Sequence, residues 1–546
     1  MSARLSPLRR TSQASFRVCT IGFLAVSIVI PTASAFGAVP KAAAPRSSIT
    51  VVSQDTCVDS GEAFAISLQA SNKIRVRVHD RISTREQFNL AIFASFKTRI
   101  TQKSSLTPDS SGTYRVEWIA GQSPLRLSGI YPVAFSEFDS DGTEIPGPVS
   151  FICVNPETPP TAQILVMGRV EVAPLATPQT TDRVDWAAVP FRTLVSHAAD
   201  ANSEGYFFTV GGNTVERWAR AEGDAAQSGF QDLKTTAANG DIVPGTYVPL
   251  DNSALVKAGL SDAIADNRVL GAEQVQSRLP GSVAPTISIS DAPTLAALAA
   301  ARQESVAIAL VPSGSLNNGN GGSGVVRTIS GSIHVVTYDD DLSLLWQAPM
   351  RKGDEVLRAH QLAAAVAFAS RRADRPIKFV VIDGGRSRVS ERFLQAWDAA
   401  NQRIPGVSRG SLAELNSQAT ASAPLSLIER DPGPVPIPTG EYRQTQADLR
   451  TLASTVDPSD PIMLRARIAA ATTVASGPLI NNAANRARPF DSKAWGAVTQ
   501  ELLGEAFAGV SLPSRTRLTL ASAKVDIPLT IRNGTNRAIP ILLRLT

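Results

Sequence analysis

Residues 333–346 read Ile-His-Val-Val-Thr-Tyr-Asp-Asp-Asp-Leu-Ser-Leu-Leu-Trp, and this stretch contains the unit that decides the fold. A short apolar strand is expected over Ile333–Tyr338, and the three acids Asp339–Asp341 follow it. The residues from Leu342 to Trp346 then show apolar positions at helical spacing. A strand that leads through a polar turn into a helix is the repeating unit of an α/β domain.

The same alternation of apolar strands and alanine-rich helices extends over residues 162–440, with helices expected at Ala292–Arg302 and Glu355–Arg372. It favours a mostly parallel sheet with helices packed outside it. The number of strands approaches that of a (β/α) barrel, so we predict a distorted (β/α)-barrel-like domain. The glycine-rich segment Asn317–Gly324 is expected to be a surface loop, because no Gly-Lys-Ser/Thr sequence follows it to bind phosphate. The expected strands are Ile164–Val170, Thr193–His197, Tyr206–Val210, Ile242–Tyr247, Thr286–Ser290, Val306–Val311, Ile333–Tyr338 and Ile377–Ile382.

Residues 49–155 have a different rhythm, in which apolar residues occupy every second position, as over Phe64–Leu68 and Tyr114–Trp118. One helical pattern, Thr84–Phe96, interrupts these strands. We predict an N-terminal β-sandwich, which ends at the proline-rich segment 155–160.

The C-terminal part of the chain divides in two. Residues 441–510 are helical in pattern, and we expect this segment to pack on one face of the α/β domain. Residues 511–546 carry strand patterns with a turn at Asn533-Gly534. They are too few to close a sandwich alone, so they are expected either to pair with another domain or to be the start of an incomplete C-terminal Ig-like β domain.

The N-terminus has the layout of a secretory signal peptide over residues 1–35. Met1–Arg17 is basic and lacks acids, Val18–Ile30 is a 13-residue apolar run, and Ala33-Ser34-Ala35 is a small-residue cleavage site. The run is too short to span a bilayer. We expect the protein to be exported, to the cell envelope or the exterior, with an uncleaved signal anchor as the alternative. Residues 36–48, rich in Ala and Pro, are expected to be a spacer.

Cleavage changes the charge of the protein. The whole chain is formally +5, and four arginines of that excess lie in the signal, so the mature chain keeps +1. This balance excludes the basic surface that nucleic acids or anionic membranes require. Membrane contact is therefore expected only through an uncleaved signal or a missing C-terminal anchor.

Two cysteines, Cys57 and Cys153, remain once Cys19 leaves with the signal. They lie 96 residues apart in the predicted β-sandwich, and an oxidising exterior favours a disulfide between them. Two buried thiols or a metal pair are the alternatives, and no cluster of histidines stands near either cysteine to complete a metal site.

The four histidines, His79, His197, His334 and His360, give no metal pattern, because no two are spaced by three or four residues. We expect each to be structural. No expected strand leads directly into a Gly-x-Ser-x-Gly nucleophile elbow or a dinucleotide-binding fingerprint. No metal and no cofactor is therefore predicted.

Acids after the predicted strands are the strongest catalytic candidates, because substrates meet the carboxyl ends of strands in α/β barrels. If two of them converged, one protonated and one ionised, they would suit glycoside hydrolysis. The alternative for each is a helix N-cap. The candidates are Asp251, Asp339, Asp340 and Asp383, with Asp200, Glu204, Asp291 and Asp341 in similar positions.

The segment Asp383-Gly-Gly-Arg386 adds a possible ligand site. Its glycines would let a sugar or phosphate approach the backbone, and Arg386 and Arg388 would bind an anion. A simple turn after a buried strand is the alternative.

Several short motifs resemble a family of uncharacterised exported actinobacterial proteins, whose genes typically lie beside that of the lipid II flippase of peptidoglycan synthesis. Members of that family usually continue into a complete β domain, a transmembrane helix and a basic tail. The resemblance implies an envelope location and a partner in cell-wall glycan or the peptidoglycan-precursor machinery, and it supplies no catalytic residue. The matching motifs are Gly129-Ile-Tyr-Pro-Val133, Tyr247-Val-Pro-Leu-Asp251 followed by Ala254-Leu255 and Ala258-Gly259-Leu260, Tyr338-Asp-Asp-Asp-Leu342, Ser492-Lys-Ala-Trp495 and Ile527-Pro-Leu-Thr-Ile-Arg-Asn533.

Three functions agree with these patterns. The first is a non-catalytic binding or scaffolding protein of cell-wall assembly, favoured because no metal motif and no nucleophile elbow is predicted. The second is a carbohydrate-active hydrolase or deacetylase-like enzyme that uses strand-end carboxylates, such as Asp251, Asp339 and Asp383. The third is a secreted adhesion module, which predicts a flat apolar patch on the first β domain.

Overall fold

The computed structural model describes residues 47–535 and residue 539, with internal gaps. The predicted signal peptide, residues 36–46 of the spacer, and most of residues 511–546 lie outside the described residues. The gaps are residues 93–95, 97–98, 107–111, 183, 201–203, 318–321, 372–377, 385–387, 418–423, 430–436, 477–489 and 512–530.

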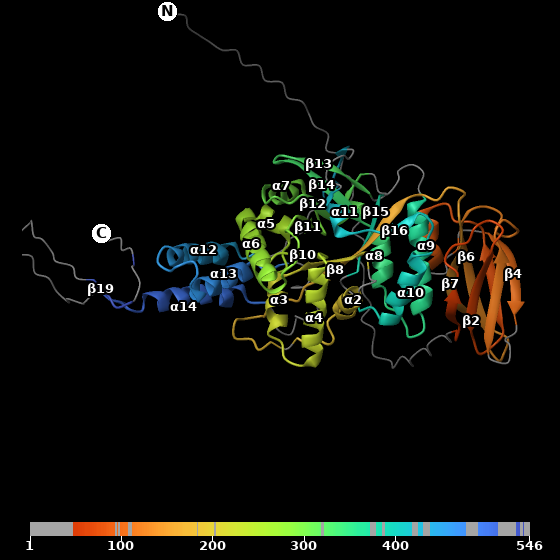
Figure 1. The fold of residues 1–546 in the computed structure, drawn as a ribbon, viewed down its shortest axis with the longest axis horizontal. Coiled ribbons are helices and arrows are strands. Elements are labelled where there is room, and N and C mark those ends of the chain that lie inside the picture. The colour runs from red at the N-terminus through yellow and green to blue at the C-terminus, as the bar shows by residue number, and fades with distance from the viewer. Residues whose placement is uncertain are drawn as a thin grey trace, which may run out of the picture. The chain divides into compact units, whose positions relative to one another are not determined.

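The first part of the chain forms two antiparallel sheets, as predicted (Figure 1). Apolar side chains from both sheets, among them Phe64, Val76 and Ile152, form one buried cluster, which makes the pair a sandwich. Helix α1 (Arg85–Ile92) lies within the predicted helical pattern. One sheet has the order β1 (Thr50–Gln54), β2 (Ala63–Gln69), β5 (Thr113–Ile119), and the other β4 (Ile100–Leu106), β3 (Ile74–His79), β6 (Gly129–Phe138), β7 (Glu144–Val154).

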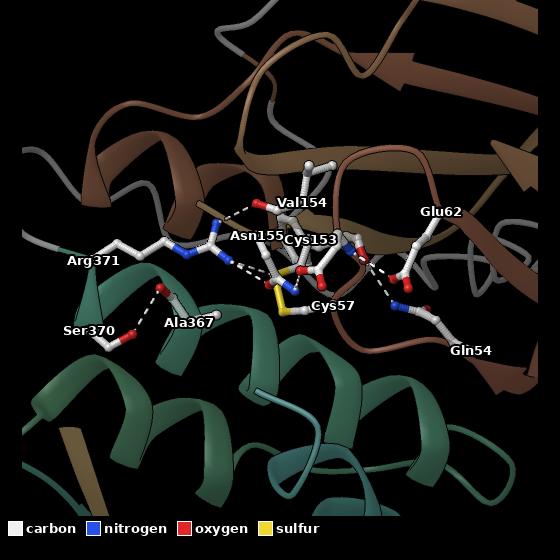
Figure 2. The surroundings of a disulfide bond; sticks show 11 residues. Gln54, Cys57, Glu62, Cys153, Val154, Asn155, Ala367, Ser370 and Arg371 are labelled. Atoms are coloured by element: carbon white, nitrogen blue, oxygen red, sulfur yellow. Dashed lines mark hydrogen bonds between the residues drawn. A yellow bond between two sulfur atoms is a disulfide. The ribbon is translucent and has the colours of Figure 1, made fainter. Parts of the chain in front are cut away.

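Cys57 and Cys153 are joined by a disulfide with an S–S distance of 2.05 Å (Figure 2). Beside it, Arg371 donates from Nη2 to Cys153 Sγ at 3.0 Å and from Nη1 to the Val154 carbonyl at 3.0 Å. Arg371 follows helix α9 (Glu355–Ser370) of the second domain, and Gln361 of α9 donates to the Val149 carbonyl at 2.7 Å. The end of β7 is therefore fixed both to the start of its own sandwich and to α9.

The central domain is built on a ten-stranded sheet, whose main path is entirely parallel (Figure 1). The path has the order β10 (Ile242–Pro244), β9 (Tyr206–Val210), β8 (Ala162–Val170), β15 (Phe379–Asp383), β14 (Gly331–Tyr338), β12 (Ile308–Pro312), β11 (Ile287–Ile289). Off this path, β13 (Ser323–Thr328) pairs with β14 and with β17 (Pro424–Leu425), and β16 (Val407–Arg409) pairs with β8.

If β10 and β11, the two ends of this path, also paired, the strands would form a ring and follow one another around it in chain order. The sheet is therefore arranged as a ring that is open between β10 and β11. In the described part of the chain no ladder joins β10 to β11, although the Val283 amide donates to the Ile242 carbonyl at 2.9 Å. The mostly parallel α/β domain is confirmed, and it is not a closed barrel. Successive residues of each strand point to opposite faces of the sheet. One face carries an inner core with Leu165, Met167 and Val381, and the other face forms an outer core that packs on the helices.

Two sequence predictions are wrong in this domain. The expected strand Thr193–His197 is part of helix α2 (Arg192–Ala198), because Leu194, Val195 and Ala198 bury one helical face. The expected loop Asn317–Gly324 ends in a strand, since β13 begins at Ser323 and pairs with β14. The other helices of the domain are α3 (Gly212–Ala219), α4 (Asp224–Ala238), α5 (Asn252–Lys257), α6 (Ser261–Arg278), α7 (Leu295–Gln303), the 3-10 turn η1 (Ser313–Ser315), α8 (Asp340–Gln347), α10 (Glu391–Asn401) and α11 (Leu412–Ser417).

Three helices follow, α12 (Thr439–Ala453), α13 (Pro461–Thr473) and α14 (Ser492–Phe507), which pack on one another, and α12 and α13 contact α6. Arg467 of α13 pairs with Glu273 of α6 at 2.8 Å, and the Tyr442 hydroxyl donates to Asp266 at 3.3 Å. Two-residue strands β18 (Val510–Ser511) and β19 (Arg532–Asn533) pair beyond α14. None of the described helices is long and apolar enough to cross a bilayer.

His197 is structural and charged. Its Nδ1 lies 3.0 Å from Glu391 and its Nε2 lies 2.8 Å from Asp398, which also accepts from the Tyr206 hydroxyl at 2.8 Å. Burial opposes the charge, but the hydrogen bonds and charges of Asp398 and Glu391 outweigh it and raise the pKa of His197. With both ring nitrogens facing carboxylates, the imidazolium joins α2 to α10.

We predict that His197→Gln destabilises the protein most at acid pH. A raised folded-state pKa contributes stability that is complete below the ordinary histidine pKa of about 6.5 and is lost as the pH rises through the folded value. The difference between the unfolding midpoints of wild type and variant, in thermal melts from pH 5.5 to 9, should therefore shrink with increasing pH. His360→Gln is the control with the opposite sign, because burial lowers the pKa of His360 to about 4. A pH-independent difference for His197→Gln would contradict the assignment.

The disulfide gives a second prediction. Replacing both Cys57 and Cys153 by Ser should lower the free energy of unfolding by roughly 4 kcal/mol, because the bridge closes a loop of about 100 residues. Urea unfolding measures this loss, and the oxidised protein should be two hydrogen atoms lighter than the reduced one by intact mass. Free thiols that react with a maleimide in the unreduced, unfolded protein would refute the bridge.

Candidate functional site

Polar side chains gather at the carboxyl ends of the parallel strands, on the inner face of the sheet. Arg169 of β8 follows Leu165 and Met167 at alternate positions, so it points to the same side as that inner core. The same alternation places Thr209 of β9 after Phe207, and Asp383 of β15 after Val381. Arg169 and Thr209 are partners in the ladder between β8 and β9.

Arg169 is the centre of this group, which also includes Asp291 after β11 and Tyr338 at the end of β14. Its Nη2 lies 2.7 Å from Asp291 Oδ1 and 2.8 Å from Asp383 Oδ2, and its Nη1 donates to Asp291 Oδ2 at 3.1 Å. The Tyr338 hydroxyl donates to Asp291 Oδ1 at 2.9 Å. We call Arg169, Thr209, Asp291, Tyr338 and Asp383 the strand-end cluster.

The cluster is charged but shielded from water. The side chains of Arg169 and Asp383 are 10% and 4% exposed, whereas Asp291 is 33% exposed and forms the open side. Burial disfavours the charge of Arg169, but Asp383 and Asp291 outweigh it and raise the pKa of Arg169 above its ordinary value. Burial, with the charge of Asp291, raises the pKa of Tyr338, which keeps this phenol a neutral donor.

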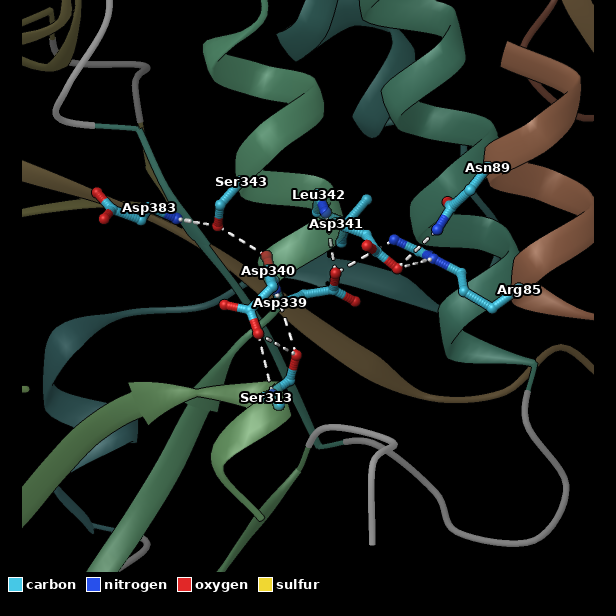
Figure 3. Close-up of polar contacts among 10 residues, drawn as sticks. Arg85, Asn89, Ser313, Asp339, Asp340, Asp341, Leu342, Ser343 and Asp383 are labelled. Carbon is cyan, nitrogen blue, oxygen red and sulfur yellow. Dashed lines mark hydrogen bonds and ion pairs between the residues drawn. The ribbon is translucent and has the colours of Figure 1, made fainter. Parts of the chain in front are cut away.

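The acid triplet after β14 serves α8 and the sandwich (Figure 3). Asp339 caps α8 by accepting from the Leu342 amide at 2.9 Å, and Asp340 accepts from the Gly314 amide at 2.9 Å. Arg85 of α1 lies 3.2 Å from Asp339 and 3.0 Å from Asp341. The triplet thus ties the start of α8 to the sandwich and to the turn at Gly314.

Other sequence candidates have different surroundings. Asp251 caps α5, accepting from the Ala254 amide at 2.9 Å, and its own backbone amide donates to the Ser476 hydroxyl at 2.9 Å. Arg388 is exposed after β15, and Arg386 lies outside the described residues. Of the four predicted acids, only Asp383 belongs to the cluster.

Sequence reasoning missed Arg169, Thr209 and Tyr338 as site residues. A signal for Arg169 was present, because it is the single charge in the strand Ile164–Val170 and shares the parity of Leu165 and Met167. Thr209 and Tyr338 gave none, since both residue types are ordinary in strands.

The cluster brings two carboxylates together without leaving them as an acid and base pair. Asp291 Oδ1 and Asp383 Oδ2 contact the same nitrogen, so the two carboxylates are neighbours. Arg169, however, lies between them, hydrogen-bonded to Asp291 and ion-paired with Asp383. In the described ranges no group of three or more His, Cys, Asp or Glu residues is placed to hold a metal ion.

The fold and the cluster define a multidomain protein in which an antiparallel β-sandwich packs on a parallel α/β domain with a buried ion cluster at its strand ends. The chain belongs to the family of unknown function DUF6049, whose model matches residues 224–545. The match covers Asp291, Tyr338 and Asp383 but begins after Arg169 and Thr209. No curated protein matches the sequence.

Solved structures with a related arrangement are distant. The α-amylase AmyC from Thermotoga maritima is 8% identical with a TM-score of 0.43, and the match covers 64% of this chain and 93% of that one. A 4-α-glucanotransferase from Thermococcus litoralis is 9% identical with a TM-score of 0.42, covering 63% and 58%. The polysaccharide deacetylase BC0361 from Bacillus cereus is 9% identical with a TM-score of 0.17, covering 65% and 99%. At these scores the likenesses carry no argument about activity.

We predict that Arg169→Met destabilises the protein by about 3–5 kcal/mol, because it leaves the Asp383 carboxylate buried without its cation. Asp291→Asn should lower the free energy of unfolding less. Asp291 is partly exposed, and the carbonyl oxygen of the asparagine side chain still accepts one hydrogen bond. Urea unfolding of the two variants measures the difference. An Arg169→Met variant as stable as wild type would show that the ion cluster is not required for the fold.

Proposed function

We propose that the protein is a non-catalytic binding or scaffolding protein of the cell envelope, exported and linked to cell-wall assembly through peptidoglycan glycan or its precursor machinery. The observation that carries the proposal is that the acids after the strands already have structural partners. Asp251 and Asp339 cap helices, and Asp383 is held by Arg169, so these acids act in structure and not as proton donors. The signal-peptide layout and the Cys57–Cys153 bridge support an oxidising, extracytoplasmic location.

Asp291 is the cluster's accessible group and therefore the expected contact for a ligand. It is one-third exposed, its orientation is fixed by Arg169 and Tyr338, and it presents a carboxylate to solvent at the strand ends. A carboxylate oriented in this way accepts hydrogen bonds from sugar hydroxyls without reorganisation. Asp291 follows a parallel strand, and ligands of α/β barrels bind at the carboxyl ends of such strands, which supports this expectation.

The alternative is a carbohydrate-active hydrolase or deacetylase-like enzyme. The proximity of Asp291 and Asp383 favours it. For either acid to take part in proton transfer, Arg169 would have to leave the space between them.

Co-sedimentation with purified peptidoglycan tests both functions. The mature chain, residues 36–546, is expected to pellet with the peptidoglycan and to release neither reducing sugar nor acetate. Binding should persist at high salt, because a mature chain of charge +1 does not depend on long-range electrostatic attraction. Failure to pellet would refute the binding proposal, and sugar or acetate release that Asp383→Asn abolishes would establish the enzyme.

A matched pair of variants locates the contact. Asp291→Asn should weaken co-sedimentation about tenfold, the change expected when a charged acceptor becomes a neutral one. Asp182→Asn is the control, because Asp182 is 34% exposed and pairs with Arg217, which is 11% exposed, outside the cluster. Equal effects of the two substitutions would show that the strand ends are not the binding site.

A further inference from the structure

A second candidate site lies on the β-sandwich, away from the strand-end cluster. The outer face of the four-stranded sheet is covered by α1 and α9 at one end, where Phe88, Phe151 and Leu362 share a core. Beyond that cover the face is hollowed into a groove of about 370 Å³. This volume lies in the range of small-molecule sites. Its lining includes Arg77, Phe96, Ile100, Ser136, Glu144 and Val149.

The polar part of the lining is a network of Arg77, Ser136 and Glu144, which Arg75 joins from outside the groove. Arg77 donates from Nη1 to the Ser136 hydroxyl at 3.0 Å and pairs through Nη2 with Glu144 Oε1, to which Ser136 also donates. Arg75 pairs with the other oxygen of Glu144. Burial opposes the charge of Glu144, but the hydrogen bonds of Ser136 and Arg77 outweigh it and lower the Glu144 pKa. One carboxylate thus stands between two guanidinium groups.

Arg77 has donors to spare on the groove side. A guanidinium carries five N–H groups, and the contacts with Ser136 and Glu144 use one on each terminal nitrogen. The Arg77 side chain is 21% exposed, so a ligand can reach it from the groove. This arrangement is suited to a planar anion, because a guanidinium binds a carboxylate through two parallel hydrogen bonds.

The rest of the lining includes apolar side chains. The ring of Phe96 stacks on that of His79, with centroids 3.8 Å apart and planes inclined by 17°. Ile100, Pro146 and Val149 also line the groove, and Ile100 is 44% exposed. An apolar group that enters here covers these surfaces and gains free energy from the removal of water.

We propose that this groove binds a small carboxylate with an apolar body, and specifically the carboxyl-terminal residue of a peptide, with its carboxylate on Arg77 and its side chain against Phe96 and Ile100. Two guanidinium groups around one carboxylate favour an anion, the shape of the Arg77 guanidinium favours a carboxylate, and the apolar lining favours a hydrophobic side chain. The proposal does not depend on glycan binding, since none of these residues belongs to the strand-end cluster.

Titration calorimetry of the mature chain with N-acetyl-leucine tests the site. Saturable binding is expected, with Arg77→Gln weakening it at least about tenfold, the usual effect of losing a charge-assisted contact. Arg115→Gln is the matched control, because Arg115 forms an exposed Arg–Glu pair with Glu117 on the other sheet of the same sandwich. No binding by the wild type, or equal loss in both variants, would overturn the proposal.

Ile100→Glu provides a test if Arg77→Gln does not fold. Ile100 is partly exposed, so the substitution is tolerated, and its carboxylate would compete with the ligand for Arg77. Binding should be lost in Ile100→Glu and retained in Ile100→Gln. Equal affinity in both would exclude Arg77 as the anchor.

Three further probes define the ligand. N-acetyl-leucine amide lacks the carboxylate and should not bind, and acetate lacks the apolar body and should bind at least about tenfold more weakly. The free acid 4-methylpentanoate should bind more weakly than N-acetyl-leucine if the ligand is a peptide end. Equal affinity for 4-methylpentanoate would replace the peptide by a free carboxylic acid, and equal affinity for acetate would show an adventitious anion only.

Discussion

The buried guanidinium of Arg169 contacts the carboxylates of Asp291 and Asp383, and these contacts hold the strand ends of the α/β domain together. Asp383 is 4% exposed, and a carboxylate at that depth requires a cation to offset its desolvation. Arg169 provides that cation and also orients Asp291, which Tyr338 holds from a third strand end. Strands β8, β14 and β15 and the segment after β11 thus meet at one ion cluster. Many α/β barrels carry their catalytic residues at the carboxyl ends of the strands, and in this domain the ion pairs of Arg169 lie at those ends.

The sandwich and the α/β domain share an interface that is both apolar and polar. Phe151 and Phe88 of the sandwich pack in the same core as α9, and Gln361 of that helix donates to the β7 backbone. At one end of the interface Arg371 contacts Cys153 and the Val154 carbonyl, so the disulfide and α9 meet (Figure 2). At the other end Arg85 reaches the acid triplet of α8 (Figure 3). The end of β14 in the α/β domain therefore lies next to residues that contact the sandwich.

Periodicity alone predicted the architecture well where strands and helices are long. The two antiparallel sheets, the parallel α/β domain and the helical segment all follow from period-2 and period-3.6 patterns. Thr193–His197 was mistaken for a strand because five residues rich in β-branched side chains do not distinguish a strand from a helical turn. The opening between β10 and β11 could not be predicted, since the order of strands in the sequence does not reveal whether two successive strands pair.

The candidate site was less predictable. Acids after strands were identifiable by position, but whether each one caps a helix, bridges a domain or joins an ion cluster depends on neighbours distant in sequence. Asp339 and Asp383 follow consecutive strands of the sheet and have different partners, Arg85 and Arg169. Of these, Arg85 comes from the sandwich, 254 residues earlier in the chain. Such partners become visible only when the fold brings them together.

Arg169 and Asp383 should behave as an energetically coupled pair at the strand ends. A double-mutant cycle with Arg169→Met, Asp383→Leu and the double variant, followed by urea unfolding, measures this coupling. We expect a coupling free energy of about 2–4 kcal/mol, with the double variant more stable than Arg169→Met, because removing both charges avoids a lone buried ion. Additive effects, with a coupling near zero, would show that the two side chains do not stabilise each other.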